Sequence, residues 1–249
     1  MFGTLALNNS DLLILILICF FAGLIRGFSG FGLSAFVMSL ALTIIPPIEL
    51  IPVCWWMEFV ASVFMIRNGW KDSDKKISVI LWLGAVFGLP VGIALTTILD
   101  FQTSKIVALV LILILALILL RNFKIQFLST SVGTISSGVF AGAATGLASI
   151  GGMIVAIYVL ASQNSVRRVR ASLVLYIFLN SVTTFIFLIL FDVMDHKAFV
   201  RGVLLAVPSS IGVVLGSILF MQKLEKYYRP FSLGLLISFS LVGLIRLTG

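Results

Sequence analysis

Long charge-free stretches alternate with short polar segments along almost the whole chain. A helix needs about 20 apolar residues to cross the hydrocarbon core of a bilayer. The stretches that carry no Asp, Glu, Lys or Arg are 12–25, 27–48, 77–99, 106–120, 171–191, 202–222 and 230–245. A further stretch, 50–66, carries only Glu58, and the charge-free run 125–166 is long enough for two crossings. The pattern therefore predicts ten membrane-spanning segments.

Two of these ten segments have an alternative interpretation. Segment 28–46 follows a glycine-rich turn, and segment 150–163 is short for a full crossing, so both could be re-entrant and leave eight spans. Cytoplasmic loops carry the excess of Lys and Arg, which tests the two models. With ten spans and an outside N-terminus, 13 of the 17 basic residues fall inside and 4 outside, whereas eight spans divide them 9 to 8. We therefore expect ten spans, with both termini outside the cytoplasm.

The two halves of the chain share a spacing of small residues. Three glycines recur 119 residues later, and three more positions recur 124 residues later. The pairs are Gly23 with Gly142, Gly27 with Gly146, Gly32 with Gly151, Gly84 with Pro208, Gly88 with Gly212, and Gly92 with Gly216. Five spans per half make the second copy enter the membrane from the opposite side, which is the inverted repeat of many secondary transporters.

The expected fold is therefore an all-α polytopic membrane protein built from two five-segment inverted repeats. The first repeat covers residues 1–124 and the second covers 125–249, within a single membrane domain. Short or broken helices are expected at the glycine turns that interrupt each repeat. Two motifs with the spacing G-x-x-x-G, at 88–92 and 212–216, are expected to let helices pack closely.

The two glycine turns, 27–32 and 146–152, are the strongest candidates for a binding site. Non-helical backbone at membrane depth survives where it lines a cavity, and matching interruptions in two halves point to a transporter site. Helices that restart after such turns direct N–H groups and a positive dipole end at an anion. Ordinary loops at the membrane surface are the alternative. The candidate substrate-binding residues are Gly27, Phe28, Ser29, Gly30, Gly32, Gly146, Ser149, Gly151, Gly152 and, from a later span, Asn180.

Glu58 is the one acidic residue well inside a predicted span. A carboxylate in the membrane is costly unless it is paired, protonated or wet, so it is a functional candidate by default. We expect it to couple substrate movement to a proton; a neutral Glu hydrogen-bonded to a neighbouring helix is the alternative. Asn180 and Ser181 lie in the corresponding span of the second half, where they either face the same cavity or join helices as polar contacts.

Two arginines are candidates for attracting an anion at the cytoplasmic mouth. Arg26 lies beside the first glycine turn and Arg170 begins a span, although both also serve as orientation charges. No metal or cofactor is expected, because the only histidine, His196, has no ligand partners in the sequence pattern. An enzyme is not expected either, since one histidine and one buried carboxylate supply too few catalytic groups.

Composition supports the membrane assignment. Of the 249 residues, 61% are hydrophobic and 10% charged, against about 25% charged in a soluble domain. Mean hydropathy is +1.23. The net charge of +8 is spread among short loops, so it describes orientation and not a nucleic-acid partner. Cys19 and Cys54 both lie in apolar runs, which excludes a disulfide framework.

Several motifs in order resemble the TauE/SafE family of sulfite exporters, over about residues 12–247. They are the first glycine turn followed by Ile45-Pro46-Pro47, the loop 67–71, the small-residue span 84–92, and their partial repetition after residue 130. The second turn departs from the family pattern, with Ser149 and Met153 where glycine is common. The resemblance implies a multi-pass protein of the bacterial inner membrane that moves sulfite or related organosulfur anions outward without hydrolysing ATP.

The leading hypothesis is a secondary transporter that exports a small anion by alternating access at a midplane site between the two repeats. An uncoupled channel or permease for small solutes is the alternative. The expected partners are a small anionic substrate and the lipid bilayer, with a homodimer as a reasonable assembly for so small a transporter.

Overall fold

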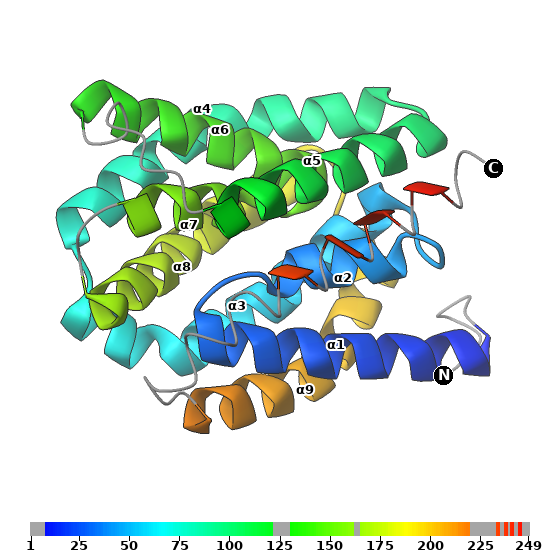
Figure 1. Cartoon of the computed structure of the whole chain (residues 1–249). Coiled ribbons are helices and arrows are strands. Elements are labelled where there is room, and N and C mark those ends of the chain that lie inside the picture. The colour runs from blue at the N-terminus through cyan, green and yellow to red at the C-terminus, as the bar shows by residue number, and fades with distance from the viewer. Residues whose placement is uncertain are drawn as a thin grey trace.

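The computed structural model describes residues 8–121, 130–161 and 165–219, with short pieces at 233–234, 237–238, 240–241 and 244–245. This part of the chain is helical and contains no strand, so the all-α prediction is confirmed (Figure 1). The helices are α1 (Asn9–Ser29), α2 (Leu33–Ala41), α3 (Pro47–Asp72), α4 (Lys75–Ile98), α5 (Phe101–Arg121), α6 (Ser131–Ala148), α7 (Gly151–Ala161), α8 (Val166–Leu190) and α9 (His196–Ile218).

Six helices within the described residues are long and apolar enough to cross a membrane, namely α1, α3, α4, α5, α8 and α9. Helices α2 and α7 have 9 and 11 residues. At 1.5 Å per residue they are roughly 14 and 17 Å long, about half the thickness of the hydrocarbon core. The prediction of ten full spans is therefore not confirmed. The expected last span, 230–245, lies largely outside the described residues.

The helices break at the two glycine turns, as the sequence predicted. Helix α1 is followed by Gly30, which has a left-handed backbone with φ 83°, and α2 begins after Gly32, with φ 90°. Helix α6 is followed by Ser149, a non-glycine residue in the left-handed region with φ 58°. The left-handed conformation terminates a helix because it redirects the next N–H group away from the helical ladder.

Close pairs of helices hold the fold together through glycines. Helix α1 packs along α9, and α4 packs along α6 (Figure 1). A Cβ on Gly88 would lie 1.9 Å from the carbonyl oxygen of Val139, and one on Gly212 would lie 2.1 Å from that of Phe20. Only glycine permits such an approach of two backbones. The prediction that the G-x-x-x-G motifs allow close packing is confirmed.

The glycine contacts recur at the displacements that the sequence showed. Each contact between α4 and α6 has an equivalent between α1 and α9. The α4 residue is replaced by the α9 residue 124 positions later, and the α6 residue by the α1 residue 119 positions earlier. The contacts are Gly88 to Val139 and Gly212 to Phe20; Gly92 to Ala143 and Gly216 to Leu24; Gly142 to Ala85 and Gly23 to Ser209; Gly146 to Leu89 and Gly27 to Val213. The two helix pairs are therefore built in the same way.

Ion pairs fix the ends of α3 against the second half of the chain. At its start, Glu49 lies 2.5 Å from Arg201 in α9. At its end, Asp72 lies 2.8 Å from Arg167 in α8. The backbone N–H of Asp74 also donates to the hydroxyl of Ser172, at 2.9 Å. The start of α3 therefore lies beside the start of α9, and its end beside the start of α8.

The outer surface of the helices is apolar. Phe87 and Ile98 in α4 are 73% and 80% exposed, and large aliphatic side chains of the other long helices are exposed in the same way. The interior, in contrast, contains polar residues, including a fully buried arginine, Arg26. Apolar groups outside and polar groups within suit a bilayer, in which lipid replaces water around the protein.

Candidate functional site

The first glycine turn is closed by its own serine. The hydroxyl of Ser29 lies 2.8 Å from the carbonyl oxygen of Ile25 and 2.7 Å from that of Phe31. It also accepts the backbone N–H of Phe31, at 3.2 Å. These contacts within the turn occupy the hydroxyl, so Ser29 stabilises the break between α1 and α2.

A buried ion pair lies directly behind this turn. Nε of Arg26 in α1 lies 2.9 Å from Oε2 of Glu58 in α3, and the Arg26 side chain is 0% exposed. Nη2 of Arg26 donates to the hydroxyl of Ser62, at 3.2 Å. Glu58 is thus paired with an arginine of a neighbouring helix, a contact that the interpretations drawn from the sequence did not include.

The same carboxylate caps the short helix α2. Oε1 of Glu58 accepts the hydroxyl of Ser34 at 2.9 Å and the backbone N–H of Ser34 at 3.3 Å. Ser34 is the second residue of α2, where N–H groups have no partner within the helix and the dipole favours negative charge. The anion position predicted at this helix start is therefore held by a carboxylate of the protein itself.

Arg170 braces the turn from α8. Its Nη2 donates to the carbonyl oxygen of Gly27, which also accepts the hydroxyl of Ser217 at 3.3 Å. Gly30 leaves space for this side chain, because a Cβ there would lie 2.8 Å from Cγ of Arg170. A cation is favourable at this end of α1, where the helix dipole is negative.

The placement of Arg26 corrects the sequence interpretation. The residue was expected at a cytoplasmic mouth, but it is wholly buried in the last turn of α1 and faces Glu58. Arg170 is partly buried and touches the turn itself. The rule that cytoplasmic loops are rich in Lys and Arg treats every arginine as a loop residue. Helix α1, however, continues beyond the charge-free stretch 12–25 and so includes Arg26.

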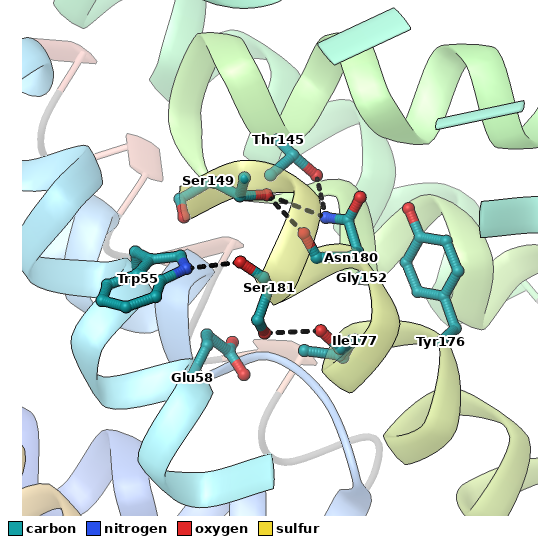
Figure 2. A pocket seen from close by; sticks show the side chains of 10 residues that line it. Trp55, Glu58, Thr145, Ser149, Gly152, Tyr176, Ile177, Asn180 and Ser181 are labelled. Carbon is teal, nitrogen blue, oxygen red and sulfur yellow. Dashed lines mark hydrogen bonds between the residues drawn. The ribbon is translucent and has the colours of Figure 1, made fainter. Parts of the chain in front are cut away.

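A small cavity of about 30 Å³ opens beside the second glycine turn (Figure 2). Its walls come from α3, α6, the turn, α7 and α8. The lining residues are Trp55, Glu58, Thr145, Ser149, Gly152, Tyr176, Ile177, Asn180, Ser181 and Thr184. A water molecule needs about 10–15 Å³ measured in this way, so the cavity holds roughly two waters or a small ion.

Asn180 places an amide in the middle of this cavity wall. Its Nδ2 lies 3.5 Å from the hydroxyl of Thr145, toward which Figure 2 shows it directed, and 3.4 Å from the hydroxyl of Thr184. Its Oδ1 is buried and has no hydrogen-bond partner among the described residues. Buried polar atoms without a partner are rare in folded proteins and call for an explanation such as a ligand or water.

Other contacts hold the walls in place. Nε1 of Trp55 donates to the backbone oxygen of Ser181, at 2.7 Å, and joins α3 to α8. The hydroxyl of Ser181 donates to the backbone oxygen of Ile177 at 2.6 Å, and so remains within its own helix. Stacking of Trp55 on Phe185, with ring centroids 4.8 Å apart, adds to this contact between the two halves.

The cavity brings together only part of the predicted site. Ser149, Gly152, Asn180 and Glu58 line it. The other candidates do not: Gly27, Phe28, Ser29, Gly30, Gly32, Gly146 and Gly151.

Apart from Gly32, the excluded glycines pack closely against neighbouring helices. A Cβ on Gly146 would lie 2.5 Å from the carbonyl oxygen of Leu89, and one on Gly151 would lie 2.1 Å from that of Ala141. Phe28, likewise, is a buried side chain at the end of α1. These positions therefore shape the turns and do not line the cavity.

Several site residues were missed from the sequence. Ser34 donates to the Glu58 carboxylate at the start of α2, and Thr145, Tyr176 and Thr184 line the cavity. One signal was present, because Thr145 lies 119 residues after Arg26, the displacement already seen for the glycines. Ser34 had no such signal, since a serine after a glycine turn is common.

Comparisons with known proteins give one match. A protein-family model described as "Sulfite exporter TauE/SafE" matches residues 15–243 of the chain. Neither a curated protein nor a solved structure matches the chain. Among the described residues, no group of three His, Cys, Asp or Glu side chains comes together as a metal site.

Proposed function

The chain belongs to the sulfite exporter TauE/SafE family, and we propose on that premise that it is a secondary transporter that exports sulfite or a related small organosulfur anion. The family implies membrane transport of such anions. Beyond the family assignment, we propose the alternating-access mechanism, the coupling to protons and the choice of anion.

The observation that carries the proposal is the cavity at the second glycine turn. Its volume suits a small inorganic oxyanion, and its lining includes Ser149, Asn180 and Thr184, which carry hydroxyl and amide groups. It also lies at the start of α7, where N–H groups and the helix dipole favour an anion.

The cavity lies between the two proposed repeats. Trp55 and Glu58 come from α3 in the first half, whereas the remaining lining residues come from α6 to α8 in the second half. A site at a repeat interface opens to either side of the membrane when one repeat rocks against the other. This placement supports alternating access.

The order of ten membrane segments is supported by the ion pairs at the ends of α3. With ten segments, Asp72 and Arg167 lie on one side of the membrane, and Glu49 and Arg201 lie together on the other. With eight, each pair would be divided between opposite sides. Distances of 2.8 and 2.5 Å therefore favour the ten-segment order.

The inverted repeat is supported by the recurring glycine contacts. The α1·α9 pair and the α4·α6 pair use residues related by displacements of 119 and 124. An inverted repeat divided at residues 1–124 and 125–249 accounts for this, because each pair then joins the first helix of one repeat to the fourth of the other. We place the protein in the bacterial inner membrane with both termini outside.

Transport of sulfite by purified protein in lipid vesicles tests the function. We expect vesicles that contain the protein to release labelled sulfite faster than protein-free vesicles, and Ser149→Phe to abolish the difference by filling the cavity. The matched control is Ile135→Phe, which adds a similar side chain on the exposed face of α6. Equal release with and without protein, for sulfite and for methanesulfonate alike, would contradict the proposal.

The sidedness has its own test. Single cysteines at Lys71 and Lys197 should react with a membrane-impermeant reagent from opposite faces of intact cells, whereas cysteines at Lys71 and Arg168 should react from the same face. Labelling of Lys71 and Lys197 from one face would contradict the ten-segment order.

A further inference from the structure

We propose that Arg26 is the cationic centre that binds the transported anion, and that Glu58 occupies this centre between transport events as a tethered carboxylate. The inference rests on the proposed function, because it names the group that would recognise the substrate. It assigns to the first glycine turn a role that the neutral cavity at the second turn cannot supply.

The first turn already has the construction of an anion site. A guanidinium from α1, a hydroxyl from Ser34 and a backbone N–H at the start of α2 converge on one carboxylate. Helix N-termini and arginines are the groups that proteins use to bind small oxyanions. The arrangement around the carboxylate of Glu58 is thus one in which the oxygens of sulfite would make the same contacts.

Arg26 has donors to spare. Its Nη1 is buried and has no hydrogen-bond partner within the described part of the chain. A guanidinium carries five N–H donors, and here only the contacts to Glu58 and Ser62 use them. A pyramidal or tetrahedral oxyanion presents more acceptor oxygens than a carboxylate, so it could engage the donors that Glu58 leaves unused.

Glu58 stands at the boundary between this centre and the cavity. It lines the cavity, whereas Arg26 and Ser34 do not. An anion that enters beside Ser149 and Asn180 therefore meets the carboxylate before it can reach the guanidinium. Repulsion between two negative charges in a low-dielectric interior keeps the anion from Arg26 as long as Glu58 is ionised and in place.

Protonation of Glu58 would exchange the two anions. When a Glu58 oxygen takes up a proton, a new O–H bond forms, the side chain becomes neutral, and its hold on Arg26 weakens. One negative charge of the substrate then replaces the charge of Glu58, so the net buried charge stays the same. One proton is bound for each substrate charge neutralised by Arg26, which makes Glu58 the link between proton and anion.

Within the described part of the chain, few other titratable groups face Glu58. They are Arg26 from α1, Cys54 one turn earlier in α3, and Tyr176 from α8 across the cavity, while Arg170 interacts electrostatically with Arg26. Helices α2 and α6 have no charged residue, and the only titratable group of α7, Tyr158, lies 2.7 Å from the hydroxyl of Thr134. The charged or titratable residues of α4, α5 and α9 lie near the helix ends: Lys75, Lys76, Lys105, His196, Lys197 and Arg201 in the first turns, and Arg121 at the end of α5.

Sulfite binding to the purified protein tests the exchange. Affinities are measured for the wild type and for Glu58→Gln from about pH 5.5 to about pH 8.5. The ratio of the two affinities at each pH cancels the titration of sulfite itself. We expect Glu58→Gln to bind at least tenfold more tightly at the highest pH and the ratio to decrease as the pH falls, because only the wild type must first protonate its tethered carboxylate. A ratio that stays constant across this range would overturn the exchange.

A charge-neutral double variant tests the role of Arg26. In Arg26→Gln/Glu58→Gln both charges are removed together, so no uncompensated charge remains in the interior. We expect this variant to purify as a folded protein and to lose sulfite binding at least a hundredfold. The matched control removes a surface pair, Arg167→Gln/Asp72→Asn, and should bind sulfite as the wild type does.

The outcomes separate the inference from the function on which it rests. Wild-type affinity in the double variant would overturn the assignment of Arg26, even if the protein transports sulfite. A wild-type protein that neither binds nor transports sulfite or methanesulfonate would instead overturn the proposed function and the inference with it. If Glu58→Gln does not fold, retained binding in the double variant still overturns the assignment, and lost binding supports it.

Discussion

The two glycine turns have the same construction but hold different chemistry. At the first, Arg26 in α1 pairs with Glu58 in α3. At the second, the residue 119 positions after Arg26 is Thr145, and it receives a weak hydrogen bond from Asn180 in α8. A charged pair in one half thus corresponds to a neutral pair in the other.

The difference determines where an anion can bind. At the first turn, the carboxylate of Glu58 occupies the start of α2. The second turn has a cavity at the start of α7, with no carboxylate among its lining residues other than Glu58 on the opposite wall. The comparison suggests that the second turn receives the substrate and the first turn controls its charge.

The largest change is expected from breaking the charged pair on one side. Arg26→Gln leaves the carboxylate of Glu58 mostly buried without its cation, which costs about 3–5 kcal/mol when a buried pair loses one partner. We expect a large fall in the thermal unfolding temperature in detergent and no sulfite transport. The control, Arg167→Gln, removes an exposed arginine of the Asp72 pair, and an exposed pair is worth about 1 kcal/mol or less. Equal losses of stability and transport in the two variants would show that the buried pair contributes no more than the exposed pair.

Substitution of equivalent glycines tests whether the halves correspond. Gly88→Ala and Gly212→Ala each place a Cβ within 2.1 Å of a carbonyl oxygen of the facing helix, so both force two backbones apart, at a cost of about 1–3 kcal/mol. We expect thermal unfolding to show losses of similar size for the two. Leu83→Ala on the exposed face of α4 serves as the control. A large loss for one glycine and none for the other would argue against matching helix pairs.

Removal of the polar group from the second turn should affect transport more than stability. Asn180→Leu keeps a similar volume, and the hydroxyls of Thr145 and Thr184 still donate to backbone oxygens of their own helices. We expect about 1 kcal/mol or less of destabilisation from the lost amide contacts and a fall of about tenfold in sulfite transport, since a good hydrogen bond to a charged ligand is worth about 1.5–3 kcal/mol. Transport at the wild-type rate would remove Asn180 from the site.

The smallest effect is expected at Ser29. Its hydroxyl is occupied inside the first turn, so Ser29→Ala should cost about 1 kcal/mol of stability and leave the sulfite concentration for half-maximal transport unchanged. The sequence placed Ser29 and Ser149 in the same role, and only Ser149 lines the cavity. A change of that concentration in Ser29→Ala, as large as that in Ser149→Ala, would restore the symmetric interpretation.

Much of the fold follows from local properties of the sequence. Charge-free stretches predicted the long helices, and the glycines predicted both helix breaks and the close contacts of Gly88 and Gly212. These features depend on burial, on φ angles and on the absence of a side chain, which a single sequence displays directly.

The candidate site was harder to predict, because it depends on contacts between distant segments. The pairing of Arg26 with Glu58 joins residues in different helices, and nothing in the charge pattern distinguishes a buried arginine from a loop arginine. The lengths of α2 and α7 were also uncertain, since apolar composition continues beyond the point where each helix ends. Asn180, in contrast, was found because a polar residue in an apolar span stands out.

The most direct test of the central claim is counterflow of sulfite in vesicles that contain the wild-type protein. A carrier with one site that faces alternately inward and outward returns faster when it is loaded, whereas an open pathway does not. The account predicts that unlabelled sulfite inside the vesicles accelerates uptake of labelled sulfite, and that Ser149→Phe abolishes this acceleration. Uptake that is rapid but independent of internal sulfite would contradict it.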